Sequence, residues 1–110
     1  MKPSILKKMK HRIVIQEPIE ISDDGGGVTI EWSDIVTLWA HIEPSNNSDS
    51  IFFEKQENIQ YYNITTRYVS SIKSGYKILF AGKQMIIKNT YSPDELKEIL
   101  VITTQEITNV

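Results

Sequence analysis

Cysteine is absent from this 110-residue chain and histidine occurs only twice, which removes many of the side chains that build catalytic and metal sites. Without cysteine there is no disulfide framework, no thiolate nucleophile and no cysteine-ligated zinc. No apolar run approaches the roughly 20 residues that a membrane-spanning helix needs. Twelve basic residues face fourteen acidic ones, so the chain also lacks the positive charge of a protein whose main task is to neutralise nucleic-acid phosphates.

Motifs for nucleophilic catalysis and phosphate binding are missing as well. The Gly-x-Ser-x-Gly pattern does not occur, and Gly82-Lys83 lacks both the following Ser or Thr and the upstream glycine of a phosphate loop. His41 and Glu43 lie two residues apart and share one face of an expected strand, but a metal site needs three or four ligands. The sequence therefore predicts a protein that is not an enzyme, with no catalytic residue, cofactor or metal.

The chain does contain enough apolar sequence for one modest core. A chain of this size can bury about two-thirds of its extended surface, and 40% of its residues are hydrophobic. We predict a single domain over residues 10–108, preceded by a basic segment at residues 1–9. That segment is interpreted as a frayed leader, as a short helix that docks its apolar residues, or as a basic arm that contacts DNA or an acidic partner. No export signal follows it, so we expect synthesis and use in a reducing cytoplasm.

Apolar residues recur mostly with a period of two, the spacing of half-buried β-strands. The pattern predicts a long hairpin with a mobile glycine-rich tip, and a second hairpin that turns tightly at residues 81–83. Pro18, Ser33-Asp34 and Pro44 are expected to break or end strands. A short helix, or else a strand, is expected over 51–57, and one helical turn at 93–95. The expected strands lie near residues 12–16, 28–32, 35–43, 61–68, 76–80, 84–89 and 96–106.

This pattern predicts a mainly β fold, a small antiparallel β-barrel or sandwich of six to seven strands with one short helix. Aromatic residues on or beside the strands would suit a barrel that stacks single-stranded nucleic acid. The residues between them are more often Glu, Asn or Thr than Lys or Arg, so we assign the aromatics to packing and keep the nucleic-acid barrel as an alternative. The residues assigned to the structural core are Trp32, Leu38, Trp39, Ile64, Tyr68, Ile78 and Phe80.

Several stretches, taken in order, resemble the phage head–tail joining family, whose members are also called head–tail adaptors, head completion proteins or stoppers. Two features depart from the family pattern. The polar stretch 45–50 replaces the Gly-x-Glu that often follows the proline, and Thr103, Thr104 or Gln105 stands where many relatives have a cysteine. The matching stretches, which span about residues 10–106, are 11–16, 23–27 with Glu31-Trp32, 36–44 with its Trp-Ala before a proline, 64–68 with its Arg-Tyr, 76–83, and 92–95 before a long strand.

The resemblance implies a structural role at the junction of a phage head and tail. Family members are small β-barrels that assemble as a homo-oligomeric ring, typically dodecameric, and connect the filled head to the tail. The implied partners are the portal or adaptor ring and tail-completion or tail-tube proteins, with phage DNA passing through without specific binding and no membrane involved. The implied location is the virion, after assembly in the cytoplasm of the bacterial host. A tail-completion role in the same neck is the nearest alternative.

Two polar segments are assigned to partner contact. Both are bounded by expected strands, and binding loops on rigid scaffolds are commonly flexible segments of this kind. Which of them faces the DNA channel is left open. The residues assigned are Asp23, Asp24, Gly25, Gly26 and Gly27 at the hairpin tip, and Ser45, Asn46, Asn47, Ser48, Asp49 and Ser50 after the proline.

Overall fold

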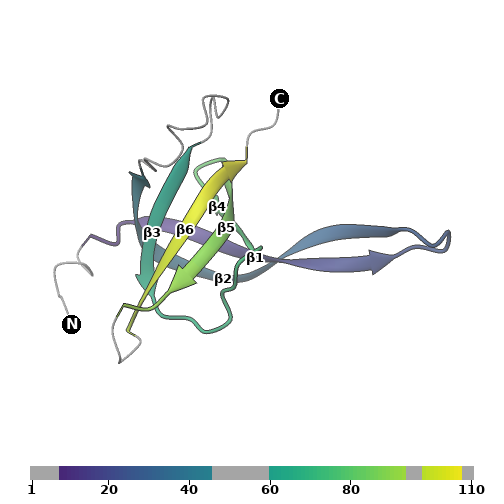
Figure 1. The fold of residues 1–110 in the computed structure, drawn as a ribbon, viewed down its shortest axis with the longest axis horizontal. Coiled ribbons are helices and arrows are strands. Elements are labelled where there is room, and N and C mark those ends of the chain that lie inside the picture. Colours follow the sequence, from purple (N-terminus) through teal and green to yellow (C-terminus); the bar gives the residue numbers. More distant parts are fainter. Residues whose placement is uncertain (1–7, 46–59, 94–97, 108–110) are drawn as a thin grey trace, which may run out of the picture.

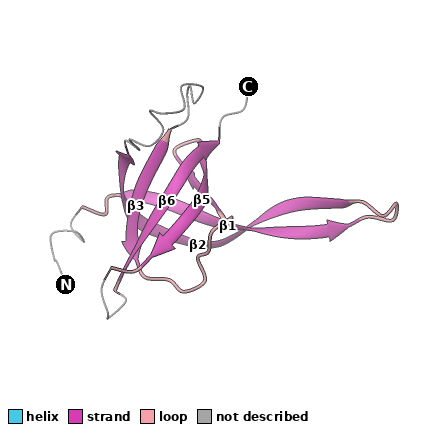
Figure 2. Ribbon diagram, in the orientation of Figure 1, coloured by secondary structure: helices cyan, strands magenta, loops and turns pink. Residues whose placement is uncertain are grey.

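The computed structural model describes residues 8–45, 60–93 and 98–107, and the regular structure within them is all β-strand (Figures 1 and 2). The strands close into a single antiparallel barrel in the order β1-β2-β3-β6-β5-β4. Pairing of β1 with β4 through Val14–Gln16 completes the ring. The predicted mainly β fold is confirmed, with six strands. Their bounds are β1 His11–Ser22, β2 Val28–Ser45, β3 Tyr61–Arg67, β4 Lys77–Phe80, β5 Lys83–Tyr91 and β6 Ile99–Ile107.

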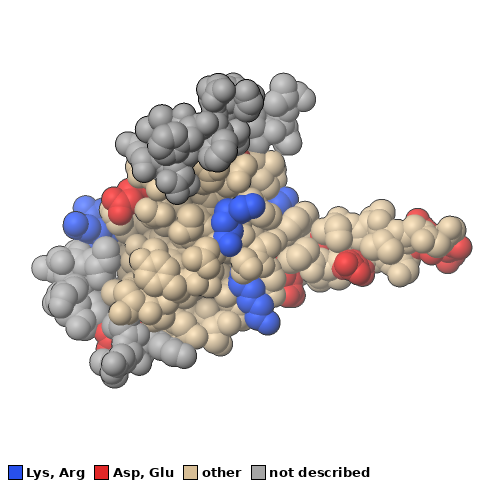
Figure 3. Space-filling view, viewed as in Figure 1, with Lys and Arg blue, Asp and Glu red and all other residues tan. Residues whose placement is uncertain are grey.

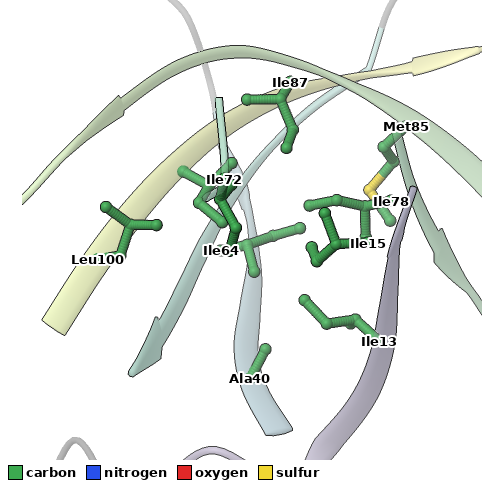
Figure 4. Packing of buried hydrophobic residues seen from close by; sticks show 10 residues of the cluster. Ile13, Ile15, Ala40, Ile64, Ile72, Ile78, Met85, Ile87 and Leu100 are labelled. Atoms are coloured by element: carbon green, nitrogen blue, oxygen red, sulfur yellow. The ribbon is translucent and has the colours of Figure 1, made fainter. Parts of the chain in front are cut away.

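The interior of the barrel is filled by one alternating set of side chains from every strand (Figure 4). Alternation arises because successive residues of a strand point to opposite faces, so a barrel takes every second residue inward. Isoleucine dominates the set, as expected for a pleated surface that favours β-branched residues. The buried cluster consists of Ile13, Ile15, Ala40, Ile64, Ile78, Met85, Ile87, Leu100 and Ile102 from the strands, together with Ile72 from the connection between β3 and β4.

Two threonines are buried within this apolar interior, and each satisfies its hydroxyl through a hydrogen bond. Thr66 Oγ1 donates to the Arg67 carbonyl at 2.8 Å, and Thr104 Oγ1 donates to the Tyr62 carbonyl at 3.1 Å. A buried hydroxyl without a partner would be costly, so these bonds let polar residues occupy inward positions.

Two strands are longer than the sequence pattern predicts, and the expected breaks at prolines are wrong. β1 runs through Pro18, and β2 runs through Ser33-Asp34 and Pro44, so the two strands expected at 28–32 and 35–43 are one. Beyond Gln16, β1 pairs only with β2, and beyond Ala40, β2 pairs only with β3. Each strand therefore has one open edge there. A residue that lacks an N–H is tolerated on such an open edge.

The residues assigned to the core divide into three groups. Ile64 and Ile78 are fully buried, and Leu38, Tyr68 and Phe80 are partly buried against the cluster. Trp32 is partly buried at the root of the β1–β2 extension. The assignment of Trp39 to the core is wrong, because the residue is 53% exposed. The neighbouring Ala40 takes the inward position, so alternation turns Trp39 outward.

The tight turn between β4 and β5 is confirmed. Phe80 pairs with Lys83, and both intervening residues, Ala81 and Gly82, have positive φ, at 51° and 83°. Two positive φ values are the requirement of the hairpin turn that matches strand twist. The expected helix over 51–57 and the helical residues 94–95 lie outside the described residues. In the parts that are described, no helix is long and apolar enough to cross a membrane.

Candidate assembly surfaces

The most conspicuous feature outside the barrel is a two-stranded extension of β1 and β2, residues 16–34, which we call the arm (Figure 1). Four large apolar side chains on it, Ile19, Ile21, Val28 and Ile30, are between 39% and 58% exposed. Cross-strand pairing opposes Ile19 to Glu31 and Glu20 to Ile30, so the apolar residues fall on both faces of the ribbon. Exposed apolar surface on a thin ribbon indicates a contact surface.

The base of the arm is fixed to the barrel by contacts from the segment that enters β4. Lys77 Nζ lies 4.3 Å from the centroid of the Trp32 ring, a cation–π arrangement. Tyr76 Oη donates to Glu17 Oε1 at 3.4 Å. A register shift between Ile15 and Gln16 occurs at the same level, and such bulges bend and twist a strand pair. These contacts set the direction in which the arm leaves the barrel.

The tip of the arm is organised by Asp23. Its Oδ1 accepts hydrogen bonds from the backbone amides of Gly25, at 2.9 Å, and Gly27, at 2.7 Å. Its own amide donates to the Gly27 carbonyl at 2.9 Å. Gly26 has a φ of 87°, which favours glycine, and a Cβ added at Gly27 would lie 2.9 Å from an Asp23 carboxylate oxygen. The three glycines therefore serve one hydrogen-bonded turn, and the mobility expected of them is opposed by these bonds.

The arm is uniformly acidic. It contains six acidic residues and no Lys, Arg or His, while the rest of the chain has all twelve basic residues. On the face of the molecule in Figure 3, the arm shows red patches and no blue, whereas blue residues lie over the barrel. The arm is therefore the negatively charged end of the molecule. The acids are Glu17, Glu20, Asp23, Asp24, Glu31 and Asp34.

At the other end of β1 and β2 the barrel surface has a hollow of about 440 Å³, which we call the Arg–Trp hollow. Trp39 forms part of it, and the guanidinium carbon of Arg12 lies 4.8 Å from the centroid of that ring. No acidic side chain is among its described lining residues. The hollow therefore combines apolar surface with two guanidinium groups. Its lining is Met9, Arg12, Thr37, Leu38, Trp39 and Arg67.

Two further polar clusters lie on the barrel. His41 Nε2 and Glu43 Oε1 are 3.9 Å apart, and within the described residues no group of three candidate metal ligands forms. Lys83 Nζ donates to Tyr62 Oη at 3.2 Å, and Tyr62 Oη donates to Glu106 Oε1 at 3.3 Å. The hydrogen bond to Tyr62, then the electrostatic interactions with Tyr62 and with the Glu106 carboxylate, raise the pKa of the Lys83 ammonium. This second cluster ties β3, β5 and β6 together.

The two segments that the sequence assigned to partner contact lie in different structural settings. Residues 23–27 form the tip of the arm, so they are positioned by the paired strands β1 and β2. Ser45 is the last residue of β2 and pairs with Tyr61, so its assignment to a loop is wrong, and residues 46–50 lie outside the described residues. Sequence reasoning missed the exposed isoleucines of the arm, because alternation alone cannot say where a barrel ends.

A small barrel with a protruding acidic arm that exposes four large apolar side chains has the architecture of a protein that makes contacts with other protein chains. Residues 6–107 match the family model for phage head completion proteins, so the chain belongs to that family. This confirms the resemblance found in the sequence, and it makes the chain a structural phage protein and a component of the virion.

Individual relatives agree with this assignment. The chain is 29% identical over 91 residues to the head completion protein gp16 of Bacillus phage SPP1, which covers 83% of this chain and 82% of that protein. The solution structure of protein SF1141 from Shigella flexneri 2a has a TM-score of 0.73 at 25% identity, covering 94% of this chain and 96% of that one. A chain from the virion of a native gene transfer agent particle has a TM-score of 0.65 at 14% identity, covering 91% and 96%, and shares the fold.

Proposed function

We propose that copies of this chain form a ring at the head–tail junction of a phage particle, below the portal or adaptor ring. The ring connects the head to tail-completion or tail-tube proteins and retains the packaged DNA until the tail is attached. The observation that carries the proposal is the match of nearly the whole chain to the head completion family. The exposed arm supports it, since a ring subunit needs a surface that meets its neighbours.

The charge of the chain supports passage of DNA without specific binding. Its formal net charge is −2 at pH 7. Affinity for DNA depends mostly on the number of phosphates that basic residues neutralise. A mildly acidic subunit therefore leaves DNA free to move through the ring.

Deletion of the gene tests the proposal in the phage that encodes the chain. We expect heads that package DNA and then lose it, or that fail to acquire tails, and rescue by the gene supplied in trans. DNase-protected DNA in purified heads and electron microscopy of tails are the measurements. A normal yield of infectious particles, or absence of the chain from them by mass spectrometry, would contradict the proposal.

The same deletion separates the two roles within the neck. Loss of a stopper gives empty heads, because nothing holds the pressurised DNA. Loss of a tail-completion protein gives full heads beside unattached tails. The proposal expects the first result.

A small single-stranded nucleic-acid-binding barrel is the second candidate, and one observation favours it. The half-exposed Trp39 ring beside Arg12 offers a surface on which a base could stack. Such a protein would bind oligonucleotides with an affinity that falls steeply as salt rises, which fluorescence polarisation measures. The proposed neck function expects no such binding.

A further inference from the structure

We infer that the arm of one copy docks into the Arg–Trp hollow of the next copy, so that the copies associate head to tail. This inference rests on the proposed ring and names the two surfaces that build it. The partner is a second copy of this chain, because both halves of a complementary pair lie on the same molecule.

The two surfaces lie at opposite ends of one strand pair. The arm begins at Gln16 and Asp34, whereas the hollow uses Arg12, Thr37 and Trp39 near the other end of β1 and β2. In Figure 1 the arm points away from the side of the barrel on which β1 begins. A copy cannot fill its own hollow with an arm that leaves in the opposite direction. A contact between different surfaces of identical subunits continues from copy to copy, and it gives a ring when the rotation closes.

Charge matches across the proposed contact. The arm has six acidic residues and no basic one. The hollow has the guanidinium groups of Arg12 and Arg67, and the exposed Lys8 and Lys10 precede Arg12 in the chain. Complementary charge steers association and disfavours the reverse pairings, because arm against arm would place acids together. Arginine also binds carboxylates in a planar, two-pronged geometry that suits Glu20 or Glu31.

Apolar surface matches as well. The arm exposes isoleucine and valine on both faces, and the hollow presents Met9, Leu38 and Trp39. Interface energy tends to concentrate in buried aromatic residues and arginines. Trp39 beside Arg12 would be such a centre once an isoleucine of the arm covers the ring.

The edges of the arm favour contact through its faces over strand addition. Within the described residues, β1 beyond Gln16 and β2 before Ala40 pair only with each other there, which leaves both edges of the arm open. Pro18 and the charged residues along the arm are devices that discourage pairing of open edges with other chains. The faces, with their isoleucines, remain the available contact surface.

Cross-linking in assembled particles tests the inference. The chain has no cysteine, so introduced thiols are the only ones. A chain with both Ile21→Cys on the arm and Thr37→Cys in the hollow should give a ladder of covalent multimers with a short bis-maleimide. A chain with only one of the two cysteines should form covalent dimers at most. Val28→Cys with Thr37→Cys is a second pair that probes the other face of the arm.

A matched control places the second thiol elsewhere. Lys88 is exposed on β5, which lies across the barrel from β2 in the strand order. Ile21→Cys with Lys88→Cys should give no ladder. The inference is overturned if both arm–hollow pairs are present in the particles and react fully with a single-ended maleimide, yet give no more multimer than this control.

Other occupants of the two surfaces give distinct results. A cross-link from Ile21→Cys to a different particle protein, identified by mass spectrometry, would overturn the inference while leaving the neck function intact. Salt-dependent binding of an oligonucleotide that Trp39→Ala abolishes would overturn both the inference and the ring-based function. Absence of the wild-type chain from particles would remove the proposed function itself.

Discussion

The guanidinium carbon of Arg12 lies 4.8 Å from the centroid of the Trp39 indole, and the two residues face each other directly in the register of β1 and β2. The pair stands on the outer surface of the barrel, where more than half of the Trp39 side chain is exposed. A tryptophan kept exposed and partnered by arginine contributes little to folding and is well placed for association. We therefore expect substitution of Trp39 to affect association more than folding.

Replacement of Trp39 by alanine should lower the free energy of unfolding by about 1–2 kcal/mol, less than a core substitution, because the residue is 53% exposed and loses one surface cation–π pair and only partial packing. Incorporation of the chain into particles should nevertheless fall sharply. Urea denaturation and quantitative mass spectrometry of purified particles measure the two effects. A large loss of stability with normal incorporation would show that the Trp39 side chain stabilises the fold and has no part in association.

The matched core substitution should behave in the opposite way. Ile64 is fully buried between strands on both sides, so Ile64→Ala should lower the free energy of unfolding by about 2–5 kcal/mol. Ile64→Val, which removes one methylene, should cost about 0.5–1.5 kcal/mol. Urea denaturation of both variants gives the comparison. Equal effects of the alanine and valine variants would contradict tight packing at this position.

Asp23 and its neighbour Asp24 provide a paired test of the arm tip. Asp23→Ala removes the acceptor for the Gly25 and Gly27 amides, so their hydrogen exchange should become faster. Asp24→Ala removes the same charge from the same turn and should leave those two amides nearly unchanged. Exchange measured by NMR distinguishes the variants. Similar exchange in both would mean that the glycines themselves, and not the Asp23 carboxylate, determine the order of the tip.

Much of the fold could be predicted from the sequence because period-two alternation survives in every strand. The inward residues Ile13, Ile64 and Ile78 lie where that alternation indicates. The breaks were less predictable. A proline ends a strand only if its missing N–H would face a partner, and whether Pro18 or Pro44 lies on an open edge depends on which strands pair across the barrel.

The assembly surfaces were harder to predict for the same reason. Ile19 and Ile30 alternate with acids just as core residues do, and only the tertiary fold shows that no sheet covers them. Trp39 was assigned to packing because few basic residues lie between the aromatic ones, yet Ala40 occupies the inward position beside it. The polar tip at 23–27, in contrast, was recognisable because glycine and aspartate mark turns independently of tertiary context.

The turn between β4 and β5 allows a test of backbone strain. Gly82 has a φ of 83°, so Gly82→Ala should destabilise the protein by about 1–2 kcal/mol, the cost of placing a Cβ in the left-handed region. No side-chain clash contributes, because nothing lies within 4 Å of the position of that Cβ. Ala81→Gly, at a φ of 51°, should be neutral or stabilising. Thermal unfolding of both variants measures the two effects. A Gly82→Ala protein that is as stable as wild type would contradict the turn geometry.

The Lys83 ammonium gives the protein a pH-dependent contribution to stability. Its hydrogen bond to Tyr62, the electrostatic interaction with Tyr62 and the Glu106 carboxylate raise its pKa above the ordinary value of 10.5. A pKa raised by folding means that the stabilisation is fully present below the unfolded value and is lost as pH rises through the folded value. The difference in melting temperature between wild type and Lys83→Met should therefore be constant below pH 10.5 and shrink above it.

The Tyr62→Phe background isolates the source of this effect. Phenylalanine keeps the ring and removes the hydroxyl that accepts from Lys83 Nζ at 3.2 Å. Because the strongest influence on the Lys83 pKa is then gone, Lys83→Met should have a smaller pH-dependent effect in this background than in wild type. The measurement is the melting temperature of wild type, Lys83→Met, Tyr62→Phe and the double variant across the alkaline pH range, which together form a double-mutant cycle. An equal effect of Lys83→Met in both backgrounds would assign the stabilisation to Glu106 and leave the Tyr62 hydroxyl without a part in it.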